Sequence, residues 1–313
     1  MATGEADGTE AYRFRPEDLR VAERRPGISA FMRIRNGAEF LEPAIRSHIS
    51  HFDEIVAVHN QCTDATPAIL ARLQGELGAD RLRVFHYEPP VFPPGSREHA
   101  QEPATSPHSL VNYYNFALAK TRFQVVAKLD DDQIAMERPV AAITGRIRAG
   151  ELPADALWCY GGINLSRDDS GRYGVPAIAP LVGLGDQWYF RVNEGTFFER
   201  DPRFERLRRP GMRRVFIGFA FWHLKYLKAE SGFANYGIAS GANARYQRKH
   251  DRFMADRSVI DLAAIPPPRS VFPFGEKARI KRAAATALRR SDVTQRDLDA
   301  MIAELEHDSR LQT

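Results

Sequence analysis

Hydrophobic and polar positions between residues 28 and 85 follow two alternating spacings. Short apolar runs rich in valine and isoleucine predict strands over 28–34, 54–58 and 82–85. Between these runs, apolar residues recur every three or four positions and predict two amphipathic helices, the first carrying Leu41, Ile45 and Ile49 and the second Ile69, Leu73 and Leu77. This order of strands and helices is typical of an α/β fold with a mostly parallel central sheet flanked by helices.

A further strand, predicted over 125–129, ends in the three aspartates Asp130, Asp131 and Asp132. A helix over 109–120 precedes it, and before that helix residues 88–108 form a proline-rich connection that could act as a lid. Open α/β sheets bind their ligands at the carboxyl ends of their strands, where these aspartates stand. Two interpretations are open at this point: a solvated charged turn, or carboxylate ligands for Mg²⁺ or Mn²⁺.

The second half of the chain has a less regular pattern. It predicts a helix over 137–148, strands over 156–163, 187–192 and 214–221, a turn-rich stretch over 164–185, and a turn into a helix over 222–228. Two helices close the chain, a basic one over 277–290 and one that starts near Thr294. We therefore expect four segments: a flexible tail (1–26), a regular α/β half (27–150), a less regular half (151–262) and a C-terminal helical extension (263–313).

Composition adds limits on the class of protein. The chain has 313 residues, 43% of them hydrophobic and 27% charged, which is ordinary for a soluble globular protein. Two cysteines give neither a disulfide framework nor a zinc site. With no apolar leader in the first residues and no apolar run long enough to span a bilayer, we expect a cytoplasmic protein, or one at the inner face of a membrane.

Three separated motifs resemble family 2 glycosyltransferases of the GT-A fold. The stretch ISAFMRIRNG is similar to their first strand and turn, and CTDAT is similar to the end of their pattern VDDGSTDGT, with Thr63, Asp64 and Thr66 matching and His59 standing where the family has its first aspartate. The stretch VVAKLDDDQI looks like the strand that carries their DxD motif, with Asp130 and Asp132 on its two aspartates. The resemblance covers residues 28–135.

This resemblance implies an enzyme that moves a sugar from a nucleotide-sugar donor to a glycan or lipid-linked acceptor, in surface polysaccharide assembly by family analogy. It implies that Asp130 and Asp132 hold Mn²⁺ or Mg²⁺, which neutralises the leaving diphosphate. It also implies a nucleotide-sugar site with the residues Arg35, Asn36, His59, Asp64, Asp130 and Asp131. Asp64 has a second interpretation, as the residue that caps the helix after it.

Two candidates come from the second half. Some GT-A enzymes complete the metal site with a histidine from this half, so His223, which follows an apolar strand, is the third predicted ligand; the alternative is a hydrogen-bonded histidine packed beside Trp222 and Tyr226. An inverting transferase needs a carboxylate base, and Asp186 is our first choice because we expect it to be exposed at a turn. An ordinary turn aspartate is the alternative.

Basic residues gather in two runs, between Arg200 and Arg214 and between Lys277 and Arg290. The first run could be a solvated face, a clamp for phosphate, or, together with the second run, a contact with an anionic membrane. The arginines are not interleaved with stacking aromatics, so we expect no nucleic acid partner.

Other enzyme classes fit the sequence less well. The turn RIRNG is neither the GxGxxG of a dinucleotide enzyme nor the glycine-rich loop of a nucleotidyltransferase, and no P-loop is present in the sequence. A phosphohydrolase would need further ligands at a recognised spacing around the three aspartates. The open alternative is a degenerate GT-A domain that acts as a non-catalytic binding or scaffold subunit.

Overall fold

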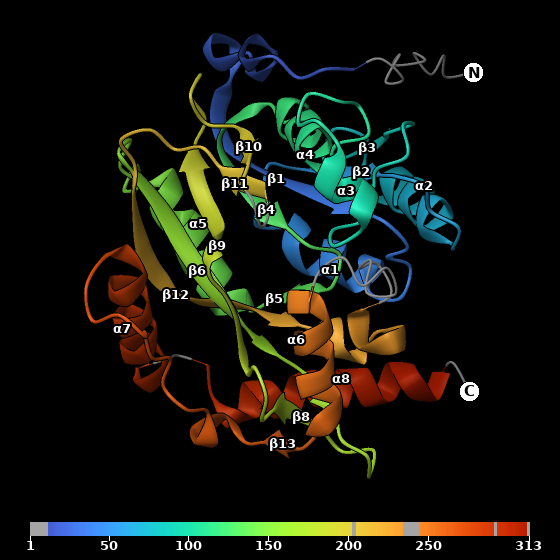
Figure 1. The fold of residues 1–313 in the computed structure, drawn as a ribbon, viewed down its shortest axis with the longest axis vertical. Coiled ribbons are helices and arrows are strands. Elements are labelled where there is room, and N and C mark those ends of the chain that lie inside the picture. Colours follow the sequence, from blue (N-terminus) through green and yellow to red (C-terminus); the bar gives the residue numbers. More distant parts are fainter. Residues whose placement is uncertain (1–11, 202–204, 234–243, 291–292, 312–313) are drawn as a thin grey trace. The chain divides into compact units, whose positions relative to one another are not determined.

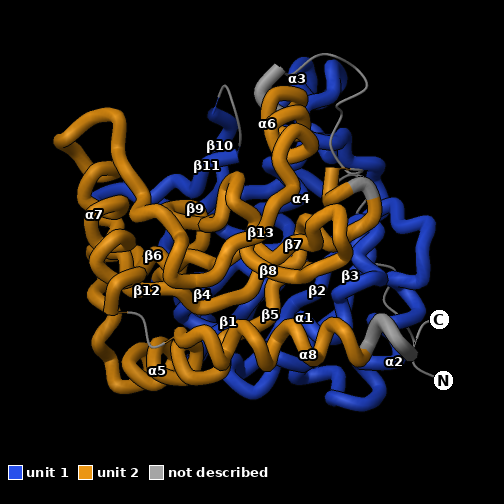
Figure 2. Tube along the Cα trace, turned by 90° about the horizontal axis from the view of Figure 1, so that it is seen from below, with its two compact units in different colours: residues 1–131, 191–211, 235–244 blue, residues 132–190, 212–234, 245–313 orange. Residues whose placement is uncertain are grey.

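The structure is a computed structural model that describes residues 12–201, 205–233, 244–290 and 293–311. The chain divides into two compact units that alternate along the sequence (Figure 2). Unit 1 comprises Met1–Asp131, Arg191–Gly211 and Asn235–Ala244, and unit 2 comprises Asp132–Phe190, Met212–Ala234 and Arg245–Thr313. Figure 1 labels the helices and strands of both units.

Unit 1 contains the parallel part of the fold. Its four central strands lie in the order β3-β2-β1-β4, and every neighbouring pair is parallel. They are β1 (Arg25–Ile34), β2 (Glu54–His59), β3 (Leu82–His86) and β4 (Phe123–Leu129). The helices are α1 (Leu41–Ile49), α2 (Thr66–Leu77), α3 (Arg97–Gln101) and α4 (Leu110–Ala119), and a small antiparallel pair is formed by β10 (Phe198–Arg200) and β11 (Glu205–Leu207).

The amino-terminal segment of unit 1 is not a free tail where the structure describes it. Two short 3₁₀ helices, Pro16–Leu19 and Val21–Glu23, lead into β1. Leu19 is fully buried, and the buried Arg24 donates hydrogen bonds to the Leu19 and Phe123 carbonyl groups. The described part of the predicted flexible segment therefore packs against the start of the sheet.

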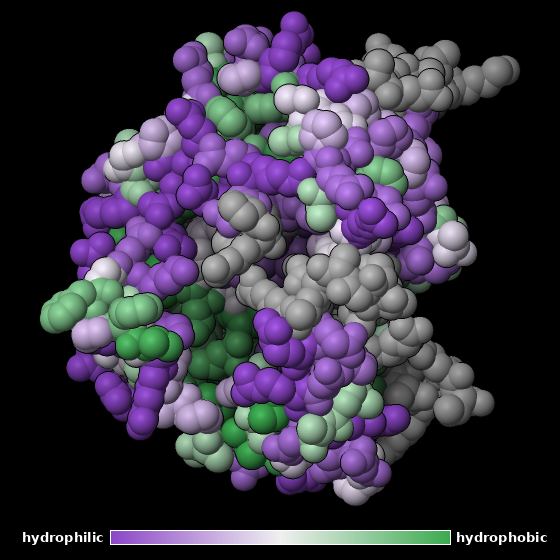
Figure 3. All heavy atoms as spheres, viewed as in Figure 1, coloured by the Kyte–Doolittle hydropathy of each residue, from purple (hydrophilic) through white to green (hydrophobic). Residues whose placement is uncertain are grey.

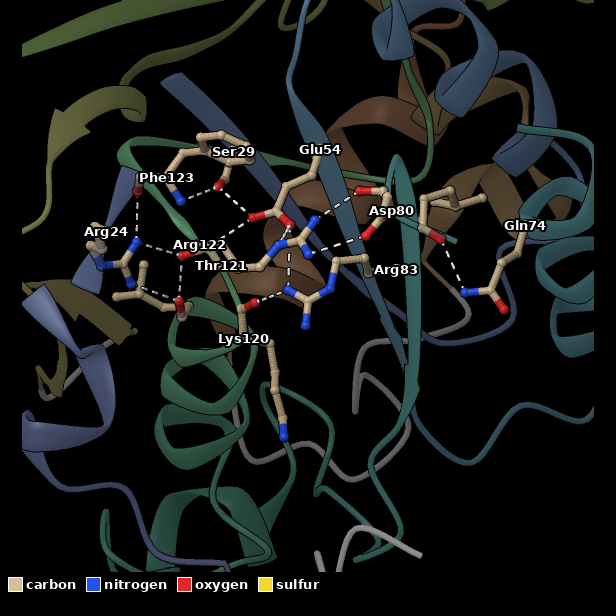
Figure 4. A network of polar contacts seen from close by, with 12 residues as sticks. Arg24, Ser29, Glu54, Gln74, Asp80, Arg83, Lys120, Thr121, Arg122 and Phe123 are labelled. Carbon is tan, nitrogen blue, oxygen red and sulfur yellow. Dashed lines mark hydrogen bonds and ion pairs between the residues drawn. The ribbon is translucent and has the colours of Figure 1, made fainter. Parts of the chain in front are cut away.

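A buried carboxylate ties the amino ends of the unit 1 strands together (Figure 4). Glu54, the first residue of β2, is fully buried and accepts a hydrogen bond from the Ser29 hydroxyl at 2.7 Å. Arg122, just before β4, donates to the same carboxylate through its backbone N–H at 2.6 Å and its Nε at 2.8 Å, and Arg83 of β3 donates at 3.3 Å. A buried charge needs this degree of pairing to be tolerated.

Unit 2 has a mixed sheet in the order β9-β6-β12-β5. The strands β6 (Ala156–Asn164) and β12 (Arg213–His223) are parallel, whereas β9 (Leu181–Arg191) and β5 (Gln133–Ala135) are antiparallel to their neighbours. A smaller sheet contains β7 (Ser166–Arg167), β8 (Tyr173–Pro176) and β13 (Val259–Ile260). The helices are α5 (Glu137–Arg148), α6 (Ala244–Ala255), α7 (Glu276–Arg289) and α8 (Gln295–Leu311), with short 3₁₀ turns at Lys225–Leu227, Ala229–Gly232 and Leu262–Ala264.

The α/β fold class predicted from the sequence is confirmed, with central strands and flanking helices in the predicted order. Two local predictions were wrong: the turn-rich stretch 164–185 contains β7, β8 and the first half of β9, and residues 222–223 belong to β12 rather than to a turn. The proline-rich connection is mostly loop, as predicted, and contains the short helix α3. Among the described helices, none combines the length and the apolar character needed to cross a membrane.

Candidate functional site

The loops that follow β1 and β2 bind each other through Asn36 and Asp64. The Asn36 backbone has a positive φ of 51°, and its side-chain oxygen accepts a hydrogen bond from the Thr63 N–H at 2.8 Å. In return, one Asp64 oxygen accepts from the Ala38 N–H at 3.0 Å and the other from the Thr66 N–H at 3.0 Å. Asp64 thus caps the start of α2, as its second interpretation required, and fixes the turn after β1.

The hydrogen bonds also set the charge state of Asp64. Burial raises the pKa of this carboxyl, but the hydrogen bonds from Thr66 and the Ala38 N–H outweigh burial, so the pKa lies below its usual value. The carboxylate is therefore ionised at neutral pH, and both of its oxygens already accept hydrogen bonds from backbone N–H groups of the two loops.

Asp131 lies against the same turn. A Cβ atom at Gly37 would stand 2.1 Å from Asp131 Oδ2, so a larger residue here would require the carboxylate to move. Asp130 points elsewhere, since Lys128 Nζ lies 3.3 Å from its carboxylate. Unit 1 therefore brings Asn36, Asp64 and Asp131 together at the carboxyl ends of β1, β2 and β4.

Two other predicted residues of the nucleotide-sugar site lie at the edges of this region. His59, the last residue of β2, stacks on His86 of β3 with ring centroids 4.7 Å apart and an interplanar angle of 12°. Burial, with the neighbouring His86, lowers the pKa of His59, so the ring is neutral at neutral pH. Arg35 donates a hydrogen bond to the Val91 carbonyl in the proline-rich connection at 3.2 Å.

In unit 2, strand pairing brings Asp132 next to His223. The short strand β5 begins directly after Asp132 and pairs antiparallel with the end of β12, so that Gln133 faces His223. The Leu224 N–H donates to the Asp132 carbonyl at 2.8 Å, and the side chains meet with His223 Nε2 3.3 Å from Asp132 Oδ1. Both side chains are 9% exposed, so this pair stands in a largely dry environment.

Asn164 fixes the tautomer of His223. It is the last residue of β6 and faces His223 across the parallel pairing of β6 with β12. Its amide nitrogen donates to the Ala179 carbonyl at 2.6 Å, so its oxygen is the atom that lies 2.6 Å from His223 Nδ1. Nδ1 therefore carries the proton, and Nε2 presents its lone pair toward Asp132 when the ring is neutral.

Lys228 completes this group of charges. Its Nζ lies 2.9 Å from Asp132 Oδ2, and its side chain is 14% exposed. Burial raises the pKa of Asp132, but His223 and Lys228 outweigh burial and hold the pKa well below its usual range. The other carboxylate oxygen, Oδ1, is buried and has no hydrogen bond among the described residues.

Asp132 and His223 carry the kinds of ligand atom that bind a divalent cation. An oxygen without a hydrogen bond faces an imidazole nitrogen whose tautomer is fixed by an outer amide, which is the usual support of a ligating histidine. Within the described residues, however, no three histidine, cysteine, aspartate or glutamate side chains are grouped so that they could hold a metal ion. The predicted ligand set Asp130, Asp132 and His223 therefore stays a prediction, of which the structure pairs the last two.

Asp186 is exposed, as expected, but it does not lie at a turn. It belongs to β9, in the stretch where the pairing of β9 with β6 changes register between Tyr160 and Gly162. Gly183 has a positive φ of 72° in the same irregular stretch. The expectation of a turn was wrong because a bulge in a strand carries the same glycine signal.

The arginine run between Arg200 and Arg214 is distributed over structural contacts. Arg206 pairs with Glu199, Arg213 lies 3.5 Å from Asp155, and Arg214 lies 2.7 Å from Glu276. Arg200 donates to the His99 and Glu102 carbonyl groups, and Arg208 stacks over Phe197. Arg203 lies outside the described residues. Where it is described, the run supports the fold.

Sequence reasoning missed Asn164 and Lys228. Asn164 directly follows the predicted strand 156–163, so the sequence could place it near the carboxyl end of that strand, but it could not show which strand lies beside it. Lys228 stands in the stretch WHLKYLK, where one lysine gives no sign that it turns toward a distant aspartate.

The comparisons with known proteins find similar folds only. The chain matches no protein-family profile and no curated protein. Mannosyltransferase PcManGT from Pyrobaculum calidifontis, in complex with GDP-Man and Mn²⁺, is 16% identical over 90% of this chain and 80% of that one, with a TM-score of 0.41. Residues 1–349 of S. aureus TarS are 13% identical over 72% of each chain, with a TM-score of 0.34.

A third match is named as a synthase. The 4-diphosphocytidyl-2C-methyl-D-erythritol synthase from Anaerococcus prevotii is 14% identical over 75% of this chain and 87% of that one, with a TM-score of 0.26. At these identities and TM-scores, the matches carry nothing about substrate or reaction.

Proposed function

We propose that this chain is a metal-dependent glycosyltransferase that moves a sugar from a nucleotide-sugar donor to a glycan or lipid-linked acceptor with inversion. The observation that carries the proposal is the Asp132–His223 pair. Asp132 stands on the second aspartate of the DxD-like motif, and it lies 3.3 Å from a histidine nitrogen whose lone pair Asn164 directs toward it. Asp132 Oδ1 is buried and lies 3.3 Å from His223 Nε2, so it can accept a hydrogen bond from a protonated His223 or bind a metal ion beside the neutral ring.

In this proposal Asp132 and His223, with Asp130 as the third ligand, hold Mn²⁺ or Mg²⁺. Carboxylate oxygen and imidazole nitrogen together suit Mn²⁺ well. The ion would supply positive charge for the diphosphate that leaves as the bond between the anomeric carbon of the sugar and the phosphate oxygen breaks and the acceptor oxygen forms the new glycosidic bond. His223 and Lys228 hold the pKa of Asp132 below its usual range, so the carboxylate is ionised at neutral pH and can bind a cation.

The nucleotide would bind at the carboxyl ends of the unit 1 strands. Asn36 lies in the tight turn around Gly37 and Asp131 lies against it, and the stacked rings of His59 and His86 offer a flat aromatic surface. Both oxygens of Asp64 bind the loop, so we assign Asp64 to shaping this site rather than to contacting the base. Asp186 remains our proposed base, as an exposed carboxylate on an irregular strand.

One observation favours the non-catalytic alternative. Lys228 already places a cation 2.9 Å from Asp132, and a scaffold subunit that had lost its metal would keep such a pair for stability. The two functions therefore differ in whether a divalent ion can displace Lys228 from Asp132.

Thermal shift separates the two functions. A panel of nucleoside diphosphates and nucleotide sugars is measured with and without Mn²⁺, on the native protein, on Asp132→Asn and on the control Asp169→Asn, whose side chain is 82% exposed. A ligand that binds the native state raises its stability by mass action. We expect a Mn²⁺-dependent shift for one nucleotide class that the control keeps and Asp132→Asn loses. A shift that is independent of Mn²⁺ and unchanged in Asp132→Asn would instead support the scaffold.

A further inference from the structure

An apolar loop projects from unit 2 just before α7. Exposed fractions are 90% for Val271, 75% for Phe272 and 85% for Phe274, and these are, with Met254, the exposed large hydrophobic residues of the described chain. Figure 3 shows hydrophobic atoms projecting at the left edge, where Figure 1 places the loop that leads into α7. Three large apolar side chains on one exposed loop are unusual and mark a contact surface.

The loop is held in this position by α7. Arg282 donates a hydrogen bond to the Pro273 carbonyl at 2.7 Å, and Lys281 donates to the Arg269 carbonyl at 2.7 Å. The helix itself is fixed to β12, because Arg214 donates to the Glu276 carboxylate through both its backbone N–H and its Nε. The apolar side chains are thus exposed by an anchored loop.

Positive charge surrounds this loop. Residues 266–290 contain seven basic residues and one acidic residue, Glu276, whose charge Arg214 neutralises at 2.7 Å. Exposed basic side chains precede the apolar loop in the sequence at Arg269 and follow it along α7 and at its C-cap, namely Lys277, Arg279, Arg282, Arg289 and Arg290. Apolar side chains within a basic surface match a bilayer with an anionic surface, which takes up the apolar groups and attracts the basic ones.

We propose that residues 269–290 form a membrane-docking surface, with Val271, Phe272 and Phe274 entering the interface of an anionic bilayer and α7 supplying the attraction. A second copy of the chain is the other candidate occupant. Three side chains of about 150–200 Å² each offer less than the roughly 800 Å² per partner that a stable dimer buries. The proposal concerns membrane binding alone and does not depend on the proposed glycosyltransferase reaction.

Vesicle co-sedimentation of the full chain tests the proposal. Vesicles are made of phosphatidylcholine alone, or with one quarter phosphatidylglycerol, at low and high salt. We expect binding to the anionic vesicles that weakens at high salt, and little binding to the neutral ones. Phe272→Ser with Phe274→Ser should weaken binding by about tenfold or more, while the control Met254→Ser, an apolar residue 46% exposed elsewhere on unit 2, should not.

A second pair of variants tests the charges. Lys277→Gln with Arg279→Gln should weaken binding by roughly fivefold for each residue, whereas Arg248→Gln with Arg252→Gln, an equal charge change on α6, should have a smaller effect. In Phe274→Trp, added anionic vesicles should shift the fluorescence of the new tryptophan to the blue. Absence of vesicle binding by the native chain, or equal binding by the double serine variant, overturns the proposal. A dimer in sedimentation equilibrium that the double serine variant abolishes would assign the loop to a second copy.

Discussion

Lys228 offers the sharpest test of the Asp132 site, because a metal ion and a lysine would compete for one carboxylate. The Lys228 ammonium lies 2.9 Å from Asp132 Oδ2, and both side chains are largely buried. Replacement by methionine keeps the length of the side chain and removes the charge. We therefore predict that Lys228→Met binds Mn²⁺ more tightly than the native protein.

The size of the effect follows from the geometry. At 2.9 Å and an effective dielectric constant of about 20, the attraction between the two charges is about 6 kcal/mol. Most of this is returned when the displaced ammonium is hydrated, so the net cost of displacing it is about 1.5–3 kcal/mol. Removal of the competitor should tighten Mn²⁺ binding by roughly 10- to 100-fold.

Binding is measured by the electron paramagnetic resonance signal of free Mn²⁺ during titration of the protein. Lys249→Met, an exposed lysine on α6, is the control and should bind as the native protein does. Asp132→Asn should abolish binding in either background. Equal or weaker binding by Lys228→Met would refute the competition and return Lys228 to a structural role.

Three further predictions concern the outer residue of the site and the stability of the fold. Asn164→Ala should weaken Mn²⁺ binding by roughly 10- to 100-fold in the same titration, because it frees the His223 ring to change tautomer. Burial lowers the pKa of His48 to about 4 from an ordinary 6.5, so the folded protein keeps this histidine neutral while the unfolded chain binds a proton below pH 6.5. The stability that the neutral His48 contributes should therefore be complete above pH 6.5 and be lost as the pH falls. In chemical unfolding, the free energy of unfolding should decline by about 2 kcal/mol between pH 7 and pH 5, and His48→Gln should lack this decline. Glu54→Gln should cost about 3–5 kcal/mol in the same assay, whereas Glu42→Gln, in a more exposed network with Arg46 and Arg72, should cost less than about 1 kcal/mol.

Each of these predictions has an outcome that contradicts it. Unchanged metal binding by Asn164→Ala would mean that the ring needs no support. A pH dependence in His48→Gln as steep as in the native protein would assign the acid sensitivity to other groups. Equal losses in Glu54→Gln and Glu42→Gln would show that burial of the carboxylate has no special cost.

The strands and helices of unit 1 were predictable because their signals are local. Each of β1, β2 and β4 contains a short, mostly apolar segment, and α2 opens with Thr66-Pro67, a strong helix start. By contrast, β5 has three residues, too few for any period to show, and β9 begins among glycines that resemble a turn. Strand formation there depends on pairing with distant partners, which a local pattern does not contain.

The same limit applies to the site. Asp132 and His223 could be named from the sequence because a family resemblance marks the first and an apolar strand precedes the second. Their approach depends on β5 pairing with β12, and the place of Asn164 depends on β6 pairing with the same strand. Lys228 follows this strand by five residues and owes its contact to the 3₁₀ turn at Lys225–Leu227.

The buried network around Glu54 has a consequence for how this protein can change over evolution. Glu54 opens β2 and His59 closes it, so the ion network and the proposed nucleotide site lie about 16 Å apart at opposite ends of the same strand. Substitutions separated by more than about 10 Å generally act independently. In the proposed function, residues at the carboxyl ends of β1, β2 and β3 can therefore be substituted in favour of new donors. The ion network at the amino ends continues to stabilise the fold when such substitutions lower its stability.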